Sequence, residues 1–316
     1  MAAFFPCPLL PTTYSLLATS AILVALTITA GTPSAMADEP IQVMSFNIRF
    51  DAGEPSDDPN AWVSTNGDHR RDKALTVIRD YGPDILGVQE AMHNQVIDLR
   101  DALPDHDFYG IGRDDGVTQG EYSGVFFRRD RFTKKSEGTF WLSETPDVAG
   151  SKYPDTCCAR IASWVVLEDT QTGGRPEYFV MNTHWEHDDH GKPARAYSSG
   201  LIREQLGVFS GGRQVILMGD LNAQEDDAEI ATLLGRDDPA GLQLTDSYRA
   251  VLPTRDPDER TYHAFNGGAE GSRIDYVLYT DTFKAIDASI VRTDFEGKYP
   301  SDHYPVTATL IVNPAP

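Results

Sequence analysis

The chain has 316 residues, of which 48 are Asp or Glu and 27 are Lys or Arg, so its formal net charge is −21. An acidic surface repels polyanions, which argues against a protein that holds duplex nucleic acid without sequence preference. Its three cysteines are too few for a disulfide framework.

The N-terminal segment has the features of an export signal. Residues 1–37 contain no charged side chain and no His, and the apolar run SLLATSAILVALTITA precedes Ala35-Met36-Ala37. This A-x-A pattern is typical of signal cleavage, although the basic segment that usually precedes the apolar run is missing. The run is short and contains several Thr and Ser, so a permanent membrane anchor is the weaker alternative. We therefore predict a signal peptide over 1–37, an exported protein and one large domain over 38–316.

Short apolar runs bounded by turn residues predict strands along the remaining chain. These runs cover residues 41–50, 85–89, 124–128, 162–168, 177–185, 214–222, 273–280 and 305–312. Apolar residues at helical spacing predict helices over 69–82, 93–104 and 193–209. The chain thus begins as β-α-β-α-β and then becomes strand-rich. This order predicts an α/β (α+β) fold in which two mixed sheets are stacked and covered by helices.

Polar side chains stand where these apolar runs end. Asp220 and Asn222 follow the run VILMG, and they would lie on one side of a strand because side chains alternate. The same pattern recurs at Asn47, Glu90, His184, Asp275, Asp302 and His303. Each residue alone has a simpler explanation as a turn or cap residue. Together, at successive strand ends, they predict a site along one rim of the sheets.

These residue types suit the hydrolysis of a phosphate ester, which needs charge neutralisation, an activated water and a stabilised leaving oxygen. Mg²⁺ prefers oxygen ligands and takes one or two carboxylates. We therefore predict that Glu90, with Asn47 and Asp302 near it, holds Mg²⁺ or Mn²⁺.

The remaining residues of the set suit the proton transfers. Asp220 would accept a proton from the attacking water, and Asn222 would hold that water or a phosphate oxygen. His303 would polarise a phosphoryl oxygen while Asp275 accepts its other N–H and fixes the tautomer. His184 would donate to the phosphate.

Six stretches occur in the order found in a known family: SFNIR, GVQEA, NTHW, GDLNA, RIDYVL and SDHYPV. With them the sequence resembles the endonuclease/exonuclease/phosphatase superfamily, which has the deoxyribonuclease I-like fold. The stretches span residues 44–306, and the matching positions of related enzymes hold the roles given above. The resemblance implies a four-layer sandwich and a single catalytic domain over 38–316. It is greatest to exported bacterial metal-dependent hydrolases, which also carry stretches like GIGRDDG (110–116), GTFWLSETP (138–146) and TYHAFNG (261–267).

Several neighbouring residues are weaker candidates for the same site. Arg113 and Arg160 are candidate contacts of the substrate phosphate, and a surface salt bridge is the alternative for Arg113. The resemblance to the deoxyribonucleases also suggests that Glu121 pairs with His184. We place His187 near the substrate. Aromatic residues could line the substrate pocket, with buried packing as the equal alternative: Trp62, Trp141, Trp185, His263 and Phe265.

Two local features remain open. His184, His187 and His190 are spaced as on a helix, which DDHGKP does not support, so the spacing does not indicate a zinc cluster. Cys157 and Cys158 are adjacent, and they form either a vicinal disulfide or two buried thiols.

The leading hypothesis is an exported Mg²⁺- or Mn²⁺-dependent phosphoesterase that acts as a monomer without stable membrane insertion. Its phosphate-ester substrate would be a nucleic acid, a phosphorylated small molecule or a phospholipid head group, and the net charge disfavours nucleic acid. A carboxylate-pair glycosidase is one alternative, but it leaves Asn47, Asn222 and the Asp275/His303 pair without a role. A non-catalytic binding module is another, and it would be expected to have lost an acid or the His.

Overall fold

The computed structural model describes residues 39–51, 53 and 55–313. The predicted signal peptide over 1–37 lies outside the described residues. None of the helices within 39–313 combines the length and the apolar character of a membrane span.

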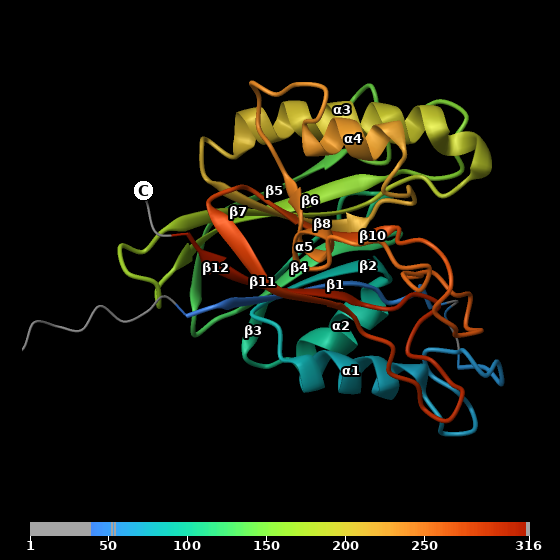
Figure 1. Ribbon diagram of the computed structural model, residues 1–316. Coiled ribbons are helices and arrows are strands. Elements are labelled where there is room, and N and C mark those ends of the chain that lie inside the picture. Colours follow the sequence, from blue (N-terminus) through green and yellow to red (C-terminus); the bar gives the residue numbers. More distant parts are fainter. Residues whose placement is uncertain (1–38, 52, 54, 314–316) are drawn as a thin grey trace, which may run out of the picture. The chain divides into compact units, whose positions relative to one another are not determined.

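Two six-stranded sheets form the centre of the fold (Figure 1). The first has the strand order β11-β12-β1-β2-β4-β3, and the second has the order β5-β6-β7-β8-β10-β9. Within them β1 runs parallel to β2 and β7 runs parallel to β8, while the other neighbours are antiparallel. The first sheet contains β1 (Ile41–Asn47), β2 (Ile85–Ala91), β3 (His106–Tyr109), β4 (Tyr122–Arg128), β11 (Phe283–Ile290) and β12 (Val306–Val312). The second contains β5 (Phe132–Trp141), β6 (Ile161–Asp169), β7 (Glu177–His184), β8 (Gln214–Asp220), β9 (Thr245–Asp246) and β10 (Asp275–Tyr279).

Helices cover the outer face of each sheet, which completes a four-layer α/β sandwich (Figure 1). Helices α1 and α2 pack on the first sheet, and α3 and α4 pack on the second. Both parallel strand pairs are joined through helices, because a parallel connection must return across the face of the sheet. The bounds are α1 (Arg70–Tyr81), α2 (His93–Ala102), α3 (Lys192–Phe209), α4 (Ala228–Leu234) and α5 (Ser247–Val251), with a 3₁₀ turn η1 (Asp189–Gly191) before α3.

The alternation of side chains places the site between the two sheets. In β8, Val215 and Leu217 point to the α3 side, whereas Ile216 and Met218 point into the layer between the sheets. Asp220 lies on the same side of β8 as Ile216 and Met218, and so points into the layer between the sheets. At this end of the inter-sheet layer the other strands also change from apolar to polar residues: Ser45 and Asn47 in β1, Gln89 in β2, Asn182 and His184 in β7, and Asp275 in β10. The polar end of an otherwise apolar layer is the candidate site.

The buried side-chain amide of Asn182 links the two sheets by hydrogen bonds beside this site. Asn182 Nδ2 donates to the carbonyls of Val88 and Gly124 at 2.8 Å each, and its Oδ1 accepts from Gln89 Nε2 at 2.6 Å. Gly87 leaves room for the amide, since a Cβ there would lie 3.0 Å from the Asn182 side chain. A buried polar group without a partner would cost about 1–3 kcal/mol, so this satisfied network holds the polar ends of the strands in register.

The two stacked mixed sheets confirm the predicted fold class. The predicted strands and helices are present with small shifts at their ends, and two of those shifts involve the site. The strand predicted over 41–50 stops at Asn47, because Arg49 takes φ 56°. The strand predicted over 214–222 stops at Asp220, because Asn222 takes φ 46°. Both residues leave the extended conformation where the chain enters the site.

Candidate active site

Asp220, at the end of β8, is the centre of the polar cluster. Its Oδ2 accepts from Asn47 Nδ2 at 3.0 Å and lies 3.5 Å from His184 Nε2 and 3.6 Å from His303 Nε2. Its Oδ1 accepts from the backbone N–H of Asn222 at 3.0 Å. Burial and the nearby carboxylate of Asp275 raise the pKa of Asp220 to about 7. Asp220 is therefore a carboxyl group that can take up and release a proton near neutral pH.

His303 and Asp275 form a buried pair beside it. His303 Nδ1 lies 2.9 Å from Asp275 Oδ2, which directs the opposite nitrogen, Nε2, toward Asp220. Burial alone would lower the pKa of His303, but the carboxylates of Asp275 and Asp220 outweigh it and raise this pKa to about 10. His303 is thus a cationic donor at neutral pH, and Asp275 holds its ring in this orientation.

His184, at the end of β7, has the opposite charge state. Burial and the positive charges of Arg160 and Arg113 lower the pKa of His184 well below its usual range. The Asn222 amide nitrogen lies 3.1 Å from His184 Nε2 and 3.2 Å from the carbonyl of Trp185, so Nε2 acts as an acceptor. The proton of the neutral ring is then on Nδ1, which faces Glu121 Oε2 at 3.8 Å. The structure therefore brings Glu121 to His184, and any N–H that His184 offers a ligand is on Nδ1.

The predicted metal ligands lie together on the other side of Asp220. Glu90 Oε1 accepts from Asn47 Nδ2 at 3.0 Å. The Arg49 guanidinium lies between Glu90 Oε2, at 3.4 Å, and Asp302 Oδ2, at 3.6 Å. Burial raises the pKa of Asp302, and the charge of Glu90 raises it further. A cationic group thus lies between two buried acids whose oxygens are the type that Mg²⁺ and Mn²⁺ prefer, and these acids fit a divalent ion.

The orientation of Asn47 differs from that of a ligand. Its amide nitrogen faces both Glu90 and Asp220, and its Oδ1 accepts from the backbone N–H of Arg49 at 3.0 Å. Asn47 therefore positions the two acids in this structure, whereas the sequence predicted that it would help to hold the metal.

The backbone of the site is strained at three places. Arg49, Glu90 and Asn222 have φ values of 56°, 61° and 46°, in the left-handed region that non-glycine residues rarely adopt. Such conformations cost roughly 1–3 kcal/mol each and persist where the surroundings hold them. Their gathering around Asp220 is typical of a functional site.

Two neighbours of the candidate site were not predicted from the sequence. Arg70, buried in the first turn of α1, donates to the carbonyls of Ile48, Arg49 and Pro300 and so joins the β1 loop to the Asp302 loop. Tyr262, which is 48% exposed, lies with its ring centroid 5.0 Å from that of His303. Tyr262 belongs to the stretch TYHAFNG, so a signal for it was present. Nothing local indicated Arg70, because its partners lie far away in the chain.

Several predicted contacts of the substrate have other partners. Arg113 forms a bidentate salt bridge with Glu121 at 2.7 and 2.8 Å, so its charge is compensated. This arrangement agrees with the salt bridge that was the alternative prediction for Arg113. Trp185 is fully buried in the core between the second sheet and α3, and it does not line a pocket. The same packing role applies to Trp141 and His263, which are at most 5% exposed. Trp62 and Phe265, in contrast, border a cavity beside Arg49, as predicted.

Arg160, Glu186 and His187 gather at the edge of the site. Arg160 donates from Nη2 to His187 Nδ1 at 2.7 Å and to Glu186 Oε1 at 3.3 Å. Arg160 is 6% exposed, and within the described part of the chain its Nε and Nη1 have no hydrogen-bond partner. Close by, a vicinal disulfide joins Cys157 and Cys158, so these residues are not free thiols here.

Known proteins share this architecture. The Endonuclease/Exonuclease/phosphatase family model matches residues 44–303. An endonuclease/exonuclease/phosphatase from Bacteroides vulgatus is 32% identical with a TM-score of 0.76, and the match covers 87% of this chain and 99% of that one. A mannosyl-6-phosphatase from Bacteroides thetaiotaomicron is 31% identical with a TM-score of 0.73, covering 86% and 99%.

A curated relative is more distant. An uncharacterized protein of Acanthamoeba polyphaga mimivirus is 26% identical over 219 residues, which is 59% of this chain but only 31% of that protein. The family match, in contrast, runs from β1 through the loop of His303 and includes every residue around Asp220. This chain is a member of the Endonuclease/Exonuclease/phosphatase family and has the hydrolase fold of that family.

Proposed function

We propose that the protein is a phosphoesterase that depends on Mg²⁺ or Mn²⁺ and hydrolyses a phosphomonoester or phosphodiester with water. One observation carries the proposal. The carboxyl group of Asp220 lies between the cationic His303 and the neutral His184. Asn47 links it to Glu90, and Arg49 links Glu90 to Asp302. A base, a cationic donor and a set of oxygen ligands thus surround one point, as metal-assisted phosphoryl transfer to water requires.

Each residue of the site has a separate role in this reaction. A divalent ion held by Glu90 and Asp302 would neutralise charge on the phosphoryl oxygens. Asp220 takes the proton of the attacking water, and its raised pKa suits that role near neutral pH. His303 donates from Nε2 to a phosphoryl oxygen while Asp275 holds the ring.

Two positioning residues complete this arrangement. Asn47 fixes the distance between the acid that binds the metal and the acid that acts as base, because its Nδ2 donates to both. Asn222 holds Asp220 through its backbone N–H, and its side chain orients His184.

A phosphorylated small molecule is the favoured substrate class. The net charge of −21 opposes the approach of a long polyanion. The similarity to a mannosyl-6-phosphatase, at 31% identity over most of both chains, supports a sugar phosphate or a related phosphomonoester. A carboxylate-pair glycosidase is disfavoured, since Asp275 is engaged by His303 and Asp220 by Asn47 and Asn222.

Metal removal tests the proposal. We expect purified protein to hydrolyse bis-p-nitrophenyl phosphate or a sugar phosphate with Mg²⁺ or Mn²⁺, and excess chelator to abolish the activity until metal is restored. Glu90→Gln should raise the metal concentration that gives half-maximal rate by about tenfold or more, because it removes a charged oxygen ligand. Glu204→Gln, an exposed acid on α3, is the matched control. Full activity in excess chelator would contradict the proposal.

We also propose export, with cleavage after Ala37. The uncharged apolar segment and the A-x-A pattern at Ala35-Met36-Ala37 support it. N-terminal sequencing of protein recovered outside the cytoplasm should begin at Asp38 or within a residue or two of it. Recovery of the protein in the membrane fraction with Met1 intact would instead identify the segment as an anchor.

A further inference from the structure

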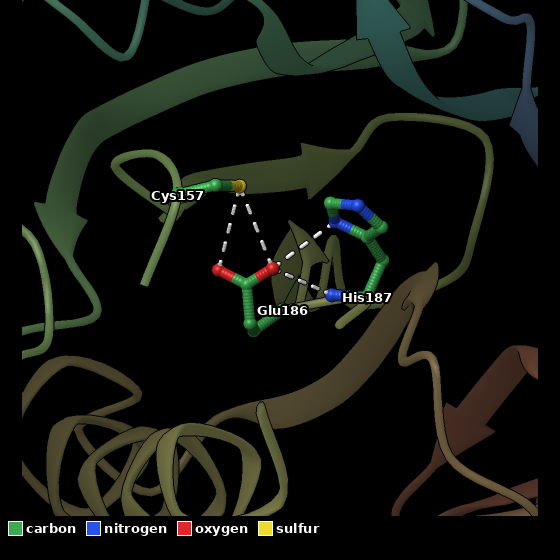
Figure 2. Close-up of side chains that lie close together, drawn as sticks. All are labelled: Cys157, Glu186 and His187. Atoms are coloured by element: carbon green, nitrogen blue, oxygen red, sulfur yellow. Dashed lines mark hydrogen bonds and ion pairs between the residues drawn. The ribbon is translucent and has the colours of Figure 1, made fainter. Parts of the chain in front are cut away.

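Three different kinds of metal-binding atom converge at the edge of the site (Figure 2). Cys157 Sγ lies 3.7 and 3.9 Å from the two carboxylate oxygens of Glu186. Glu186 Oε1 in turn lies 3.0 Å from His187 Nδ1. The three ligand atoms all lie within 4.8 Å of one another, which is close enough for one ion to contact all of them.

The fold brings these residues together from two loops. Strands β6 and β7 are antiparallel neighbours, so the loop that enters β6 lies beside the loop that leaves β7. Cys157 is in the first loop, and Glu186 and His187 are in the second. Glu186 is 1% exposed, and its carboxylate accepts from the backbone N–H groups of His187 at 2.9 Å and Asp188 at 3.4 Å. One prospective ligand is therefore fixed, while the exposed Cys157 and His187 can adjust around it.

The chemistry of these donors differs from that of the active site. Glu90 and Asp302 offer only oxygen, which suits Mg²⁺ or Mn²⁺. Sulfur, imidazole nitrogen and a carboxylate suit Zn²⁺ and similar thiophilic ions, provided that the sulfur is a thiolate. The structure holds Cys157 in a disulfide with Cys158, and a disulfide sulfur is a poor ligand. Reduction would free the sulfur of Cys157 to bind as a thiolate.

We propose that reduction of the Cys157–Cys158 disulfide opens a site for one thiophilic divalent cation such as Zn²⁺, held by the Cys157 thiolate, Glu186 and His187. A dithiol reductant gives two electrons to the disulfide and becomes a disulfide itself, and two cysteine thiols form. When the ion binds, the Cys157 thiol releases its proton to solvent. These three ligands leave the fourth tetrahedral position of Zn²⁺ to a water molecule.

Charge explains why the site depends on reduction. With the disulfide closed, the carboxylate of Glu186 is balanced by the guanidinium of Arg160 at 3.3 Å, and a divalent ion would be repelled. The Cys157 thiolate adds a negative charge beside the carboxylate of Glu186, and one divalent ion compensates both. The ion must also take the lone pair of His187 Nδ1 that now accepts from Arg160 at 2.7 Å. Arg160 thereby loses one partner when the site fills.

Cobalt spectroscopy of the full protein tests this proposal without measuring catalysis. Co²⁺ bound to thiolates gives a sulfur-to-metal charge-transfer band, and the active-site acids contain no sulfur. Cys7 is the third cysteine of the chain, so the measurement uses the Cys7→Ser protein, in which the band reports only this site. We expect one equivalent of Co²⁺ to produce the band after reduction, no band in the oxidised protein, and loss of the band when Zn²⁺ is added.

Variants assign the ligands. Cys157→Ser should remove the band or weaken Co²⁺ binding by at least about tenfold, and His187→Gln should weaken it by a similar factor. His190→Gln is the matched control, since this exposed histidine lies three residues further along the same loop. A reduced protein without the band, an equal band in the oxidised protein, or unchanged binding in Cys157→Ser or His187→Gln would overturn the proposal.

Discussion

Asp220→Asn is expected to lower turnover about 10²–10⁴-fold at saturating substrate and metal, which is the range for loss of a positioned general base. The amide keeps the shape of the carboxyl group, and its single oxygen can still accept from either Asn47 or the backbone N–H of Asn222, but it cannot accept the proton of the attacking water. Steady-state rates with a small phosphate ester measure the loss. The exposed acid Asp281 provides the control, and Asp281→Asn should retain full activity.

Stability separates this loss from misfolding. The pKa of Asp220 is raised from 3.8 to about 7, so the folded protein holds this proton more tightly than the unfolded chain does. Ionised Asp220 therefore destabilises the fold, and this destabilisation develops as the pH rises from 3.8 to about 7. In the metal-free protein at pH 8, Asp220→Asn should need at least as much urea to unfold as the wild type. An inactive variant that unfolds in less urea would indicate damage to the fold, and an active variant would show that Asp220 is not the base.

The sequence was sufficient to predict which residues gather at the candidate site, because the information is local. The apolar run of β8 alternates between two core layers, so the position of Asp220 on the inter-sheet side follows from counting residues. The pairing of His303 with Asp275 came from family resemblance and from the need of a buried acid for a partner, and the structure places the two atoms 2.9 Å apart. These predictions rested on the order of the residues along the chain and on elementary electrostatics.

The residue roles that could not be predicted from the sequence depend on contacts between distant parts of the chain. Arg70 acts through carbonyls as far away as Pro300, and nothing within its own helix indicates that role. The sequence left Arg113 as either a phosphate contact or a salt-bridge partner, and the fold places Glu121 against it. The missed strands have physical reasons as well. Half of β5 is an exposed polar run, TKKSE (133–137), and a register shift between Ala285 and Asp287 interrupts the alternation of β11. The short elements β3, β9, α4 and α5 were also not predicted, because their patterns are too brief to show a period.

His303→Ala is expected to lower turnover by about 10²–10⁴-fold, because the cationic N–H that faces the phosphoryl oxygen is lost. Asp275→Asn should cause a smaller loss and a change in pH dependence. The protonated form of His303 is the active one, so the rate falls as the pH rises through its pKa of about 10. Asp275 raises that pKa, and without its charge the rate should begin to fall at a lower pH. A pH–rate profile of each enzyme measures the shift, and Asp281→Asn should leave the basic limb unmoved.

The double variant decides whether His303 and Asp275 act as one unit. Asp275 touches the reaction only through the imidazole, to which it is bonded at 2.9 Å, so once His303 is gone little remains for Asp275 to support. The combined loss in His303→Ala/Asp275→Asn should therefore be close to that of His303→Ala alone, and well below the product of the two single losses. Losses that multiply would mean that Asp275 serves the reaction by another route. A basic limb that stays in place in Asp275→Asn would mean that a different group controls the fall in rate at high pH.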